Sequence, residues 1–302
     1  MSSNNKYSIK ESHFISKGLK CAGTLYLPNL KNEKLPIVIL AHGFAAERSF
    51  RLPAFADCFA RNGIAAYFFD YRTFGDSEGE PRHLVDPKAH QEDWHNAISF
   101  VANMEQIDPK KIAIWGSSFS GGHVLQVGAE SKDVAVIISQ VPHVDGFATT
   151  VMGKPIDILK ASFAAVKDYT SQAILNKPFY SQVVGKTDQF AAMNAPEAWD
   201  GWHAIVPKDS PWKNQVQSKI FLSLPLYSPA KFASKIKVPT LIIAGNNDTI
   251  TPAKAAQKAA NKIKQAEFHL LECNHFQAYI GEHFEENIEL QLNFLKRHLS
   301  NR

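Results

Sequence analysis

Cysteine is scarce in this chain and follows no recognisable pattern. The 302 residues include three cysteines, Cys21, Cys58 and Cys273, which lie far apart in the sequence. An odd and scattered set of this kind provides neither a disulfide framework nor the C-x-x-C spacing of a metal site. We therefore expect a protein of a reducing compartment, the cytoplasm, with no bound metal.

Long apolar runs and a strong charge of one sign are also lacking. No segment approaches the roughly 18 consecutive apolar residues of a membrane-spanning helix, and residues 1–6 lack the apolar run of a signal peptide. The net charge of +4 is scattered along the chain, so no basic patch for nucleic acid or for a membrane surface stands out. We expect no nucleic-acid partner and no membrane partner, and the sequence does not indicate an oligomeric state.

The pattern of apolar residues predicts alternating strands and helices. Strand-like runs occupy residues 7–15, 19–27, 35–41, 64–69, 111–115, 134–139, 240–244 and 267–271, and helical spacing occurs in 50–61, 90–104, 123–127, 253–264 and 284–298. Such alternation is typical of a mainly parallel, doubly wound α/β sheet with helices on both faces. The first two strands, joined by a tight turn, are predicted to form an antiparallel edge. We expect one domain over residues 1–302.

One long stretch interrupts this alternation. From about residue 142 to 229 no strand-like buried run occurs, whereas residues 156–166 and 169–175 have helical patterns. A segment of this length is too long for a bare loop, so we expect a mostly helical cap, inserted between two strands and lying over their C-terminal ends. The cap also contains three tryptophans, for which packing onto the core is the simplest interpretation: Trp199, Trp202 and Trp212.

The most informative segment is a turn of small residues around Ser118. It follows the predicted strand that ends at Trp115, it precedes a predicted helix, and Gly116 stands two residues before the serine. A serine on such a sharp strand-to-helix turn is typical of a nucleophile elbow, where small neighbours let the two backbones approach closely. Ser120 stands where a second glycine is usual. We predict that Ser118 is the nucleophile, with Ser117 and Ser120 as alternatives.

Two later loops offer the acid and the base that a serine nucleophile needs. Asp248 follows the buried strand 240–244, and His275 follows the strand 267–271. Because the carboxyl ends of parallel strands meet at one edge of a sheet, we expect both side chains near Ser118, in the chain order nucleophile, acid, base. Asp248 is also well placed to cap a following helix. The weaker candidates are Asp145 for the acid, and His269 and His283 for the base.

Backbone N–H groups close to Ser118 are expected to bind the oxyanion of a tetrahedral intermediate. We assign one donor to Phe119, directly after the nucleophile. The second is assigned to Phe44, in the loop after strand 35–41, where Gly43 lets the backbone turn in closely. His42 in the same loop is predicted to be structural rather than catalytic.

Together these motifs resemble those of the α/β-hydrolase family, over about residues 7–300. The residues that carry the resemblance are AHGF (41–44), DYRTFGDSEG (70–79), WGSSFSGG (115–122), GNND (245–248) and NHF (274–276). More narrowly, the chain resembles the bacterial branch related to dienelactone hydrolases and Xaa-Pro dipeptidyl-peptidase-like serine hydrolases. This resemblance implies the α/β-hydrolase fold and a Ser-His-Asp triad.

The sequence departs from that branch at two places. Dienelactone hydrolases use a cysteine nucleophile, whereas the elbow here carries Ser118, so the resemblance does not imply their activity. Thr73 stands where many relatives have a glycine in the loop 70–79. Arg72 and Asp76 of the same loop are predicted to form an ion-paired structural turn.

We therefore expect a serine hydrolase that cleaves small or medium acyl esters through an acyl-enzyme. A small-molecule acyl substrate is the expected partner. No cofactor is expected, because the sequence contains no ligand cluster, P-loop or dinucleotide fingerprint. The alternatives are a thioesterase or acyltransferase, a peptidase or amidase, and a non-catalytic ligand-binding protein of the same fold. A dehalogenase or epoxide hydrolase is disfavoured, because these enzymes need an aspartate at the elbow. For a peptidase, no carboxylate of the cap can be assigned to the peptide's amino terminus, among them Asp157, Asp168 and Asp188.

Overall fold

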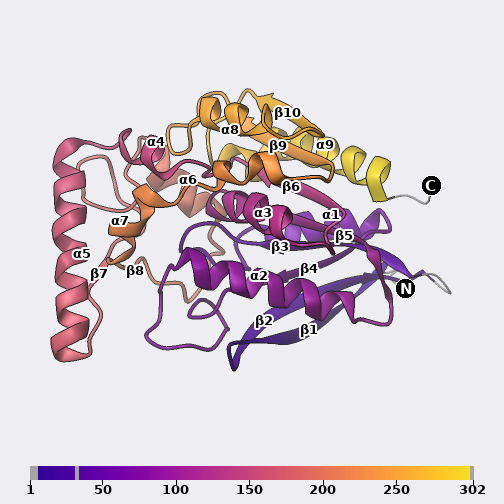
Figure 1. The fold of residues 1–302 in the computed structure, drawn as a ribbon, viewed down its shortest axis with the longest axis horizontal. Helices are drawn as coiled ribbons and strands as arrows, with labels where there is room; N and C mark the ends of the chain where they lie inside the picture. The colour runs from indigo at the N-terminus through magenta and orange to yellow at the C-terminus, as the bar shows by residue number, and fades with distance from the viewer. Residues whose placement is uncertain (1–5, 31–33, 300–302) are drawn as a thin grey trace.

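The protein is organised around an eight-stranded sheet in the order β1-β2-β4-β3-β5-β6-β9-β10 (Figure 1). The structure, a computed structural model, describes residues 6–30 and 34–299. The strands are β1 (Tyr7–Ser16), β2 (Leu19–Pro28), β3 (Leu35–Ala41), β4 (Ala65–Phe69), β5 (Ile107–Ser117), β6 (Val136–Gln140), β9 (Thr240–Gly245) and β10 (Ala266–Leu271). β1 and β2 form the predicted antiparallel edge, β2 is antiparallel to β4, and the remaining neighbours pair in parallel. The predicted mainly parallel, doubly wound sheet is confirmed.

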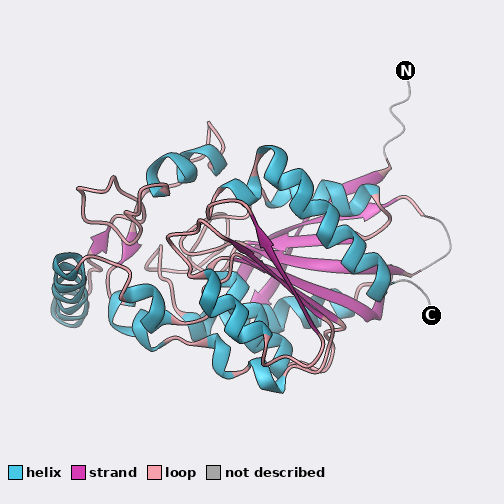
Figure 2. Cartoon of the chain, turned by 90° about the horizontal axis from the view of Figure 1, so that it is seen from above, coloured by secondary structure: helices cyan, strands magenta, loops and turns pink. Residues whose placement is uncertain are grey.

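Helices cover both faces of the sheet (Figure 2). α1 (Leu52–Arg61) and α9 (Gly281–Leu299) pack against each other, α2 (Pro87–Ala102) and α3 (Phe119–Glu130) do likewise, and α8 (Ala253–Ala260) packs on β9 and β10. The central strands β3, β4 and β6 are almost entirely buried, and so is the part of β5 from Ile112 to Ser117. This burial explains why their sequences read as continuous apolar runs rather than as alternating patterns.

The largest difference from the predicted elements is the start of α3. The helix begins at Phe119, directly after Ser118, and not at His123. Ser120, Gly121 and Gly122 have low helix propensity, but tight packing selects small residues here. A Cβ atom at Gly122 would lie 2.1 Å from the carbonyl oxygen of His143. Packing against the chain after β6 therefore outweighs the local preference.

The chain between β6 and β9, residues 141–239, is named the inserted segment below. Its helices are α4 (Gly146–Thr150), α5 (Pro155–Leu175), α6 (Ala198–Ile205) and α7 (Ile220–Ser223), followed by 3₁₀ turns at Leu224–Leu226, Pro229–Lys231 and Ala233–Lys235. Two-residue strands, β7 (Tyr180–Ser181) and β8 (Val216–Gln217), pair antiparallel within it and are not predicted by the sequence. α4 to α7 lie together at one end of the molecule, with α5 at its edge (Figure 1).

The prediction of two separate helical pieces in this segment is wrong, because α5 runs without a break from Pro155 to Leu175. Asp168 lies in the middle of α5, is buried, and accepts hydrogen bonds from the backbone N–H groups of Phe179 and Lys219. This buried carboxylate thus fastens α5 to the chain that follows it.

No helix in residues 6–30 and 34–299 combines the length and apolar character needed to span a bilayer. The expectation of no signal peptide rests mostly on residues 1–5, which lie outside the described residues.

A buried polar network lies beneath the turn at Ser118 and joins the centre of the sheet to α9. The side-chain oxygen of Gln140 accepts hydrogen bonds from Asn287 (2.6 Å) and Gln291 (2.9 Å), and its amide group donates to Ser117 (3.0 Å). Gln291 in turn accepts a hydrogen bond from the indole N–H of Trp115 at 2.7 Å. These side chains are almost completely buried, so each hydrogen bond replaces one that water would otherwise make.

We predict that Gln140→Leu lowers the free energy of unfolding by about 2–4 kcal/mol, because it leaves buried N–H groups of Asn287 and Gln291 unpaired. Urea unfolding followed by circular dichroism measures this loss. Gln126→Leu, on the partly exposed side of α3, is the matched control and should cost less than about 1 kcal/mol. Equal losses in the two variants would contradict the prediction.

Candidate active site

Ser118 occupies a strained turn between β5 and α3. Its backbone angles, φ 55° and ψ −118°, lie in a region that residues other than glycine rarely adopt. The turn is fixed from both sides, since the N–H of Ser118 donates to the carbonyl of Gln140 and its own carbonyl accepts from His143, each at 2.9 Å. A Cβ atom at Gly116 would lie 2.1 Å from the carbonyl oxygen of Ser120. The predicted need for small residues at this elbow therefore has a direct geometric cause.

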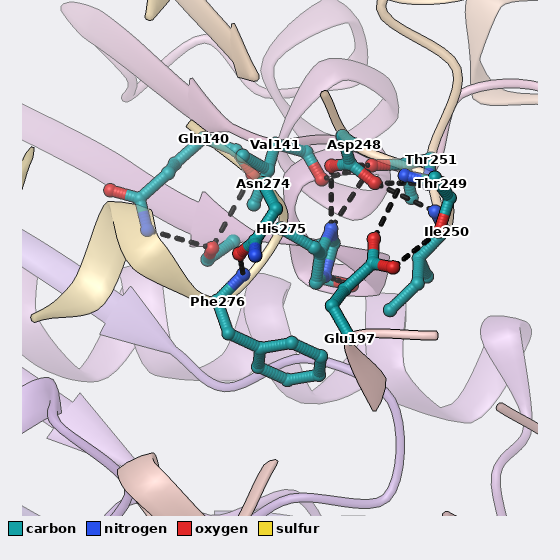
Figure 3. A network of polar contacts seen from close by, with 12 residues as sticks. Gln140, Val141, Glu197, Asp248, Thr249, Ile250, Thr251, Asn274, His275 and Phe276 are labelled. Carbon is teal, nitrogen blue, oxygen red and sulfur yellow. Dashed lines mark hydrogen bonds and ion pairs between the residues drawn. The ribbon is translucent and has the colours of Figure 1, made fainter. Parts of the chain in front are cut away.

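The structure brings the side chains of Ser118, His275 and Asp248 together. His275 Nε2 lies 3.1 Å from Ser118 Oγ, and His275 Nδ1 lies 2.7 Å from Asp248 Oδ2. All three side chains are nearly buried. Figure 3 shows His275 and Asp248 facing each other at the ends of neighbouring loops. The arrangement is that of a nucleophile, a base and an orienting carboxylate in hydrogen-bond contact.

Asp248 is held in its ionised form by the loop that carries it. Burial alone would raise the pKa of this carboxyl, but the His275 ring and hydrogen bonds from Thr251 together hold the pKa below its usual value. The N–H groups of Ile250 and Thr251 donate to Oδ1 at 2.8 and 2.7 Å, and the Thr251 hydroxyl donates to Oδ2 at 2.8 Å. Asp248 thus also caps the following turn, and its orientation toward His275 is fixed.

The alternative serines are engaged elsewhere. Ser120 Oγ lies 2.8 Å from the hydroxyl of Tyr71, which accepts a hydrogen bond from the indole of Trp94. Ser117 Oγ lies 2.5 Å from the hydroxyl of Tyr279 and belongs to the Gln140 network. Both hydroxyls serve buried packing, which leaves Ser118 as the serine that contacts His275.

The alternative acid and bases also have other environments. Asp145 is the N-cap of α4 and accepts a hydrogen bond from the N–H of Ala148 at 3.1 Å. His269 lies in β10 with its ring 3.9 Å from Glu267, and His283 lies near the start of α9. Within the described residues, His275 is the histidine hydrogen-bonded to Ser118.

The two predicted oxyanion donors border the same space as Ser118. Phe119 is the first residue of α3, where a backbone N–H has no carbonyl partner within the helix. Phe44 follows Gly43, and a Cβ at Gly43 would lie 3.0 Å from Ser118 Cβ, so the loop after β3 touches the nucleophile. The rings of Phe44 and Phe119 meet edge to face at 5.6 Å. Their N–H groups remain the predicted donors.

His42 belongs to the buried packing beside this loop. Its Nδ1 lies 3.0 Å from the carbonyl of Gly43, and its ring packs edge to face on Tyr71. Burial lowers the pKa of His42, although the nearby Asp70 opposes the shift. A neutral, buried ring is consistent with the structural role predicted from the sequence.

The predicted ion pair within the loop 70–79 is wrong in its partners. Arg72 pairs with Asp93 of α2 at 2.6 Å, and Asp76 pairs with Arg48 at 2.9 Å. These two side chains therefore fasten the loop to α2 and to the loop after β3.

Two hollows meet at Ser118. The larger, with a volume of about 350 Å³, is lined by Phe119, His143 and residues of the inserted segment such as Met152 and Leu224. The smaller, of about 30 Å³, is lined by His275, Phe276, Tyr279, Phe50 and Trp202. Burial lowers the pKa of His143 to about 4, so this side chain is neutral near pH 7. The larger hollow therefore combines apolar side chains with a few polar groups, among them the cationic Lys154, as small-molecule sites often do.

Sequence reasoning misses several residues around the site. Thr251 has a hydroxyl and lies three residues after Asp248, and this spacing could have suggested a hydrogen bond to the carboxylate. Glu197 of the inserted segment accepts hydrogen bonds from the N–H (2.9 Å) and the hydroxyl (2.5 Å) of Thr249 (Figure 3). The inserted segment therefore contacts the loop that carries Asp248. Met193 borders both hollows. Glu197 and Met193 come from a segment whose path the sequence does not reveal.

Within the described residues no group of three or more histidine, cysteine, aspartate or glutamate side chains could hold a metal ion.

Comparisons with known proteins identify relatives of this chain. A family model described as X-Pro dipeptidyl-peptidase (S15 family) matches residues 17–280. The chain is 38% identical over 284 residues to the quorum-quenching protein AidA of Acinetobacter baumannii (strain MDR-ZJ06), covering 94% of this chain and 93% of that protein.

More distant relatives have names that describe acyl chemistry. The polyketide transferase ATR5 of Stachybotrys chlorohalonatus (strain IBT 40285) is 26% identical, over 93% of this chain and 94% of its own. A thiohydrolase of Eupenicillium brefeldianum is 26% identical over 86% of each chain. The solved structure of the DcsB complex with its substrate analogue superposes with a TM-score of 0.85 at 21% identity, over 97% of this chain and 100% of that chain. This last likeness confirms the predicted fold.

We predict that Asp248→Asn lowers activity by about 10⁴-fold, because an amide cannot hold the His275 tautomer that accepts the Ser118 proton. Steady-state hydrolysis of an acyl ester measures the loss. Asp145→Asn is the matched control and should keep most of the activity. Similar losses in both variants would contradict the role of Asp248.

The dependence of the unfolding free energy on pH should also differ between Asp248→Asn and the wild type. The pKa of Asp248 is lower in the folded chain than the ordinary value of 3.8. Its ionised form therefore stabilises the fold above about pH 4, and this contribution is lost as the pH falls through the lower, folded value. Asp248→Asn should be less stable than the wild type at pH 7, and its unfolding free energy should fall less steeply below pH 4. Urea unfolding at pH 7, 4 and 3 checks this.

Proposed function

We propose that this chain, which belongs to the X-Pro dipeptidyl-peptidase (S15) family of α/β hydrolases and is a serine hydrolase, cleaves acyl esters through an acyl-enzyme on Ser118. The observation that carries the proposal is the continuous contact from Asp248 through His275 to Ser118 on the strained turn. A non-catalytic ligand-binding protein would not need these three groups in register, and this argues against that alternative.

In the first half of the reaction, Ser118 Oγ attacks the ester carbonyl carbon while His275 Nε2 takes the serine proton. Asp248 stabilises the imidazolium that forms, across the 2.7 Å contact to Nδ1. The negative charge on the carbonyl oxygen is bound by the N–H groups of Phe44 and Phe119. His275 then returns the proton to the alcohol oxygen, which leaves.

In the second half, water attacks the acyl carbon and gives a proton to His275 Nε2. The carboxylic acid leaves as Ser118 Oγ recovers that proton. The strained backbone keeps Oγ at the mouth of both hollows and so aligns the nucleophile before substrate arrives. No step requires a cofactor.

Thioester hydrolysis or acyl transfer is the second candidate. Relatives that match most of the chain are named thiohydrolase and polyketide transferase, and the same triad chemistry releases a thiol as readily as an alcohol. Peptide cleavage is disfavoured. Asp168, a carboxylate of the inserted segment, is already occupied by two backbone N–H groups and is unavailable to bind a peptide's amino terminus.

The environment of the three cysteines supports our proposal that the protein is cytoplasmic. Cys21, Cys58 and Cys273 are free, and Cys21 and Cys273 are buried. Burial raises the pKa of the Cys273 thiol to about 12, so this thiol stays protonated and unreactive.

We predict that a fluorophosphonate probe labels Ser118 in the wild-type protein, as identified by peptide mass spectrometry. Ser118→Ala should lose the adduct and at least about 10⁴-fold in activity toward an acyl ester. His275→Ala should label far more slowly, whereas Ser120→Ala should still be labelled. Rates measured on an ester, a thioester and an amide that carry the same acyl chain then show which of the candidate reactions is fastest. Labelling of Ser117 or Ser120 instead of Ser118 would overturn the proposal.

A further inference from the structure

The two hollows at Ser118 differ in one chemically decisive residue. Both are lined by Phe44, Ser118 and Met193, but only the smaller is lined by His275. His275 must donate a proton to the leaving alcohol and accept one from the attacking molecule, and each transfer needs hydrogen-bond contact with its ring. The leaving group and the acyl acceptor therefore belong in the smaller hollow, and the acyl chain belongs in the larger one.

The smaller hollow is tightly limited in size. Its volume of about 30 Å³ holds about two or three water molecules, since a single water needs about 10–15 Å³ of such space. An alcohol with a chain of several carbons does not fit beside His275 unless one of the lining side chains moves.

The walls that limit this hollow are rigid. Trp202 packs on Phe50 at 5.8 Å, on Trp212 at 5.3 Å and on Phe276 at 6.2 Å between ring centroids. Trp212 is itself tied to the carbonyl of Ala45 by a 2.9 Å hydrogen bond. The aromatic wall from the inserted segment is thus anchored on the loop that carries Phe44, and widening it would break several contacts at once.

Met193 lies at the boundary between the smaller hollow and the larger one. It lines both, and its backbone is held by hydrogen bonds to Val183 (2.9 Å) and Gly185 (3.0 Å). Its side chain therefore forms part of the boundary between the spaces proposed for the acyl chain and for the acceptor, together with Phe44 and Ser118.

On the basis of the proposed function, we infer that the smaller hollow is an acceptor site that admits water and short alcohols and excludes longer ones. The preferred substrates are then medium-chain acyl esters of a short alcohol, and the acyl-enzyme is resolved by water. With an alcohol as acceptor, its oxygen bonds to the acyl carbon, its proton passes to His275 Nε2, and the bond from Ser118 Oγ to the acyl carbon breaks as Oγ takes that proton. A longer alcohol cannot reach this position.

The test is a competition for one acyl-enzyme. The full-length protein is given the methyl ester of a medium-chain acid together with ethanol, butanol or hexanol at equal molarity, and the ratio of new ester to free acid is measured by mass spectrometry. We expect the wild type to form ethyl ester detectably and butyl or hexyl ester at least about tenfold less, since steric rejection of a few methylenes is worth about that much. Hydrolysis of methyl and hexyl esters of the same acid should show the same order in kcat/KM.

Trp202 and Ile205 both line the smaller hollow. Trp202→Ala should enlarge it, and the milder Ile205→Ala replaces that variant if Trp202→Ala fails to fold. Each should raise the ratio of butyl ester to acid by about tenfold or more. Met152→Ala enlarges only the acyl hollow and is the matched control, expected to change acyl-chain preference and leave the acceptor ratio unaltered.

Two outcomes would overturn the inference: equal transfer to ethanol and hexanol by the wild type, or a shift of the acceptor ratio by Met152→Ala but by neither of the other variants. Failure of the proposed function is distinguishable, because it would appear as the absence of a Ser118 adduct and of any ester hydrolysis in the wild type.

Discussion

The backbone of Ser118 is the constraint on which the site depends. A residue with a side chain at φ 55° is held there only because its neighbours leave no alternative. Gly116 permits the strand and the helix to meet, Gly43 lets the next loop touch the serine, and Gln140 accepts the serine N–H. These contacts come from β3, β5 and β6, at the middle of the sheet, so the strain is supported by the best-packed part of the molecule.

The central sheet also determines where the two partner loops end. β6 pairs with β9, and β9 pairs with β10, so the loops that carry Asp248 and His275 emerge next to the elbow and beside each other. Thr251 then orients the carboxylate, and Glu197 reaches across from the inserted segment to hold Thr249. Distant parts of the sequence thus converge because parallel strands present all their C-terminal ends at one edge.

Much of this arrangement could be predicted from sequence for a physical reason. Strands buried on both faces must be continuously apolar, so β3, β6 and β9 were recognisable within one or two residues. The candidate triad residues were recognisable because each lies within a few residues after a predicted strand, although β10, which precedes His275, is an edge strand that is only partly buried. Local patterns failed where tertiary packing overrides propensity, as at Ser120–Gly122 in the first turn of α3, and at Asp168, two of whose hydrogen-bond donors, the N–H groups of Phe179 and Lys219, lie outside its own helix. The boundary at Met193 had no signal, because nothing local marks a methionine as part of a boundary between two hollows.

The order of the site along the chain has a consequence for biosynthesis. The elbow at Ser118 leaves the ribosome well before Asp248 and His275, and the whole inserted segment is made between them. β9 and β10 add to the free edge of β6 only when the last part of the chain emerges. On the proposed mechanism, a nascent chain therefore carries Ser118 without its proposed base until about residue 275 has been synthesised, and the reaction cannot begin before that point.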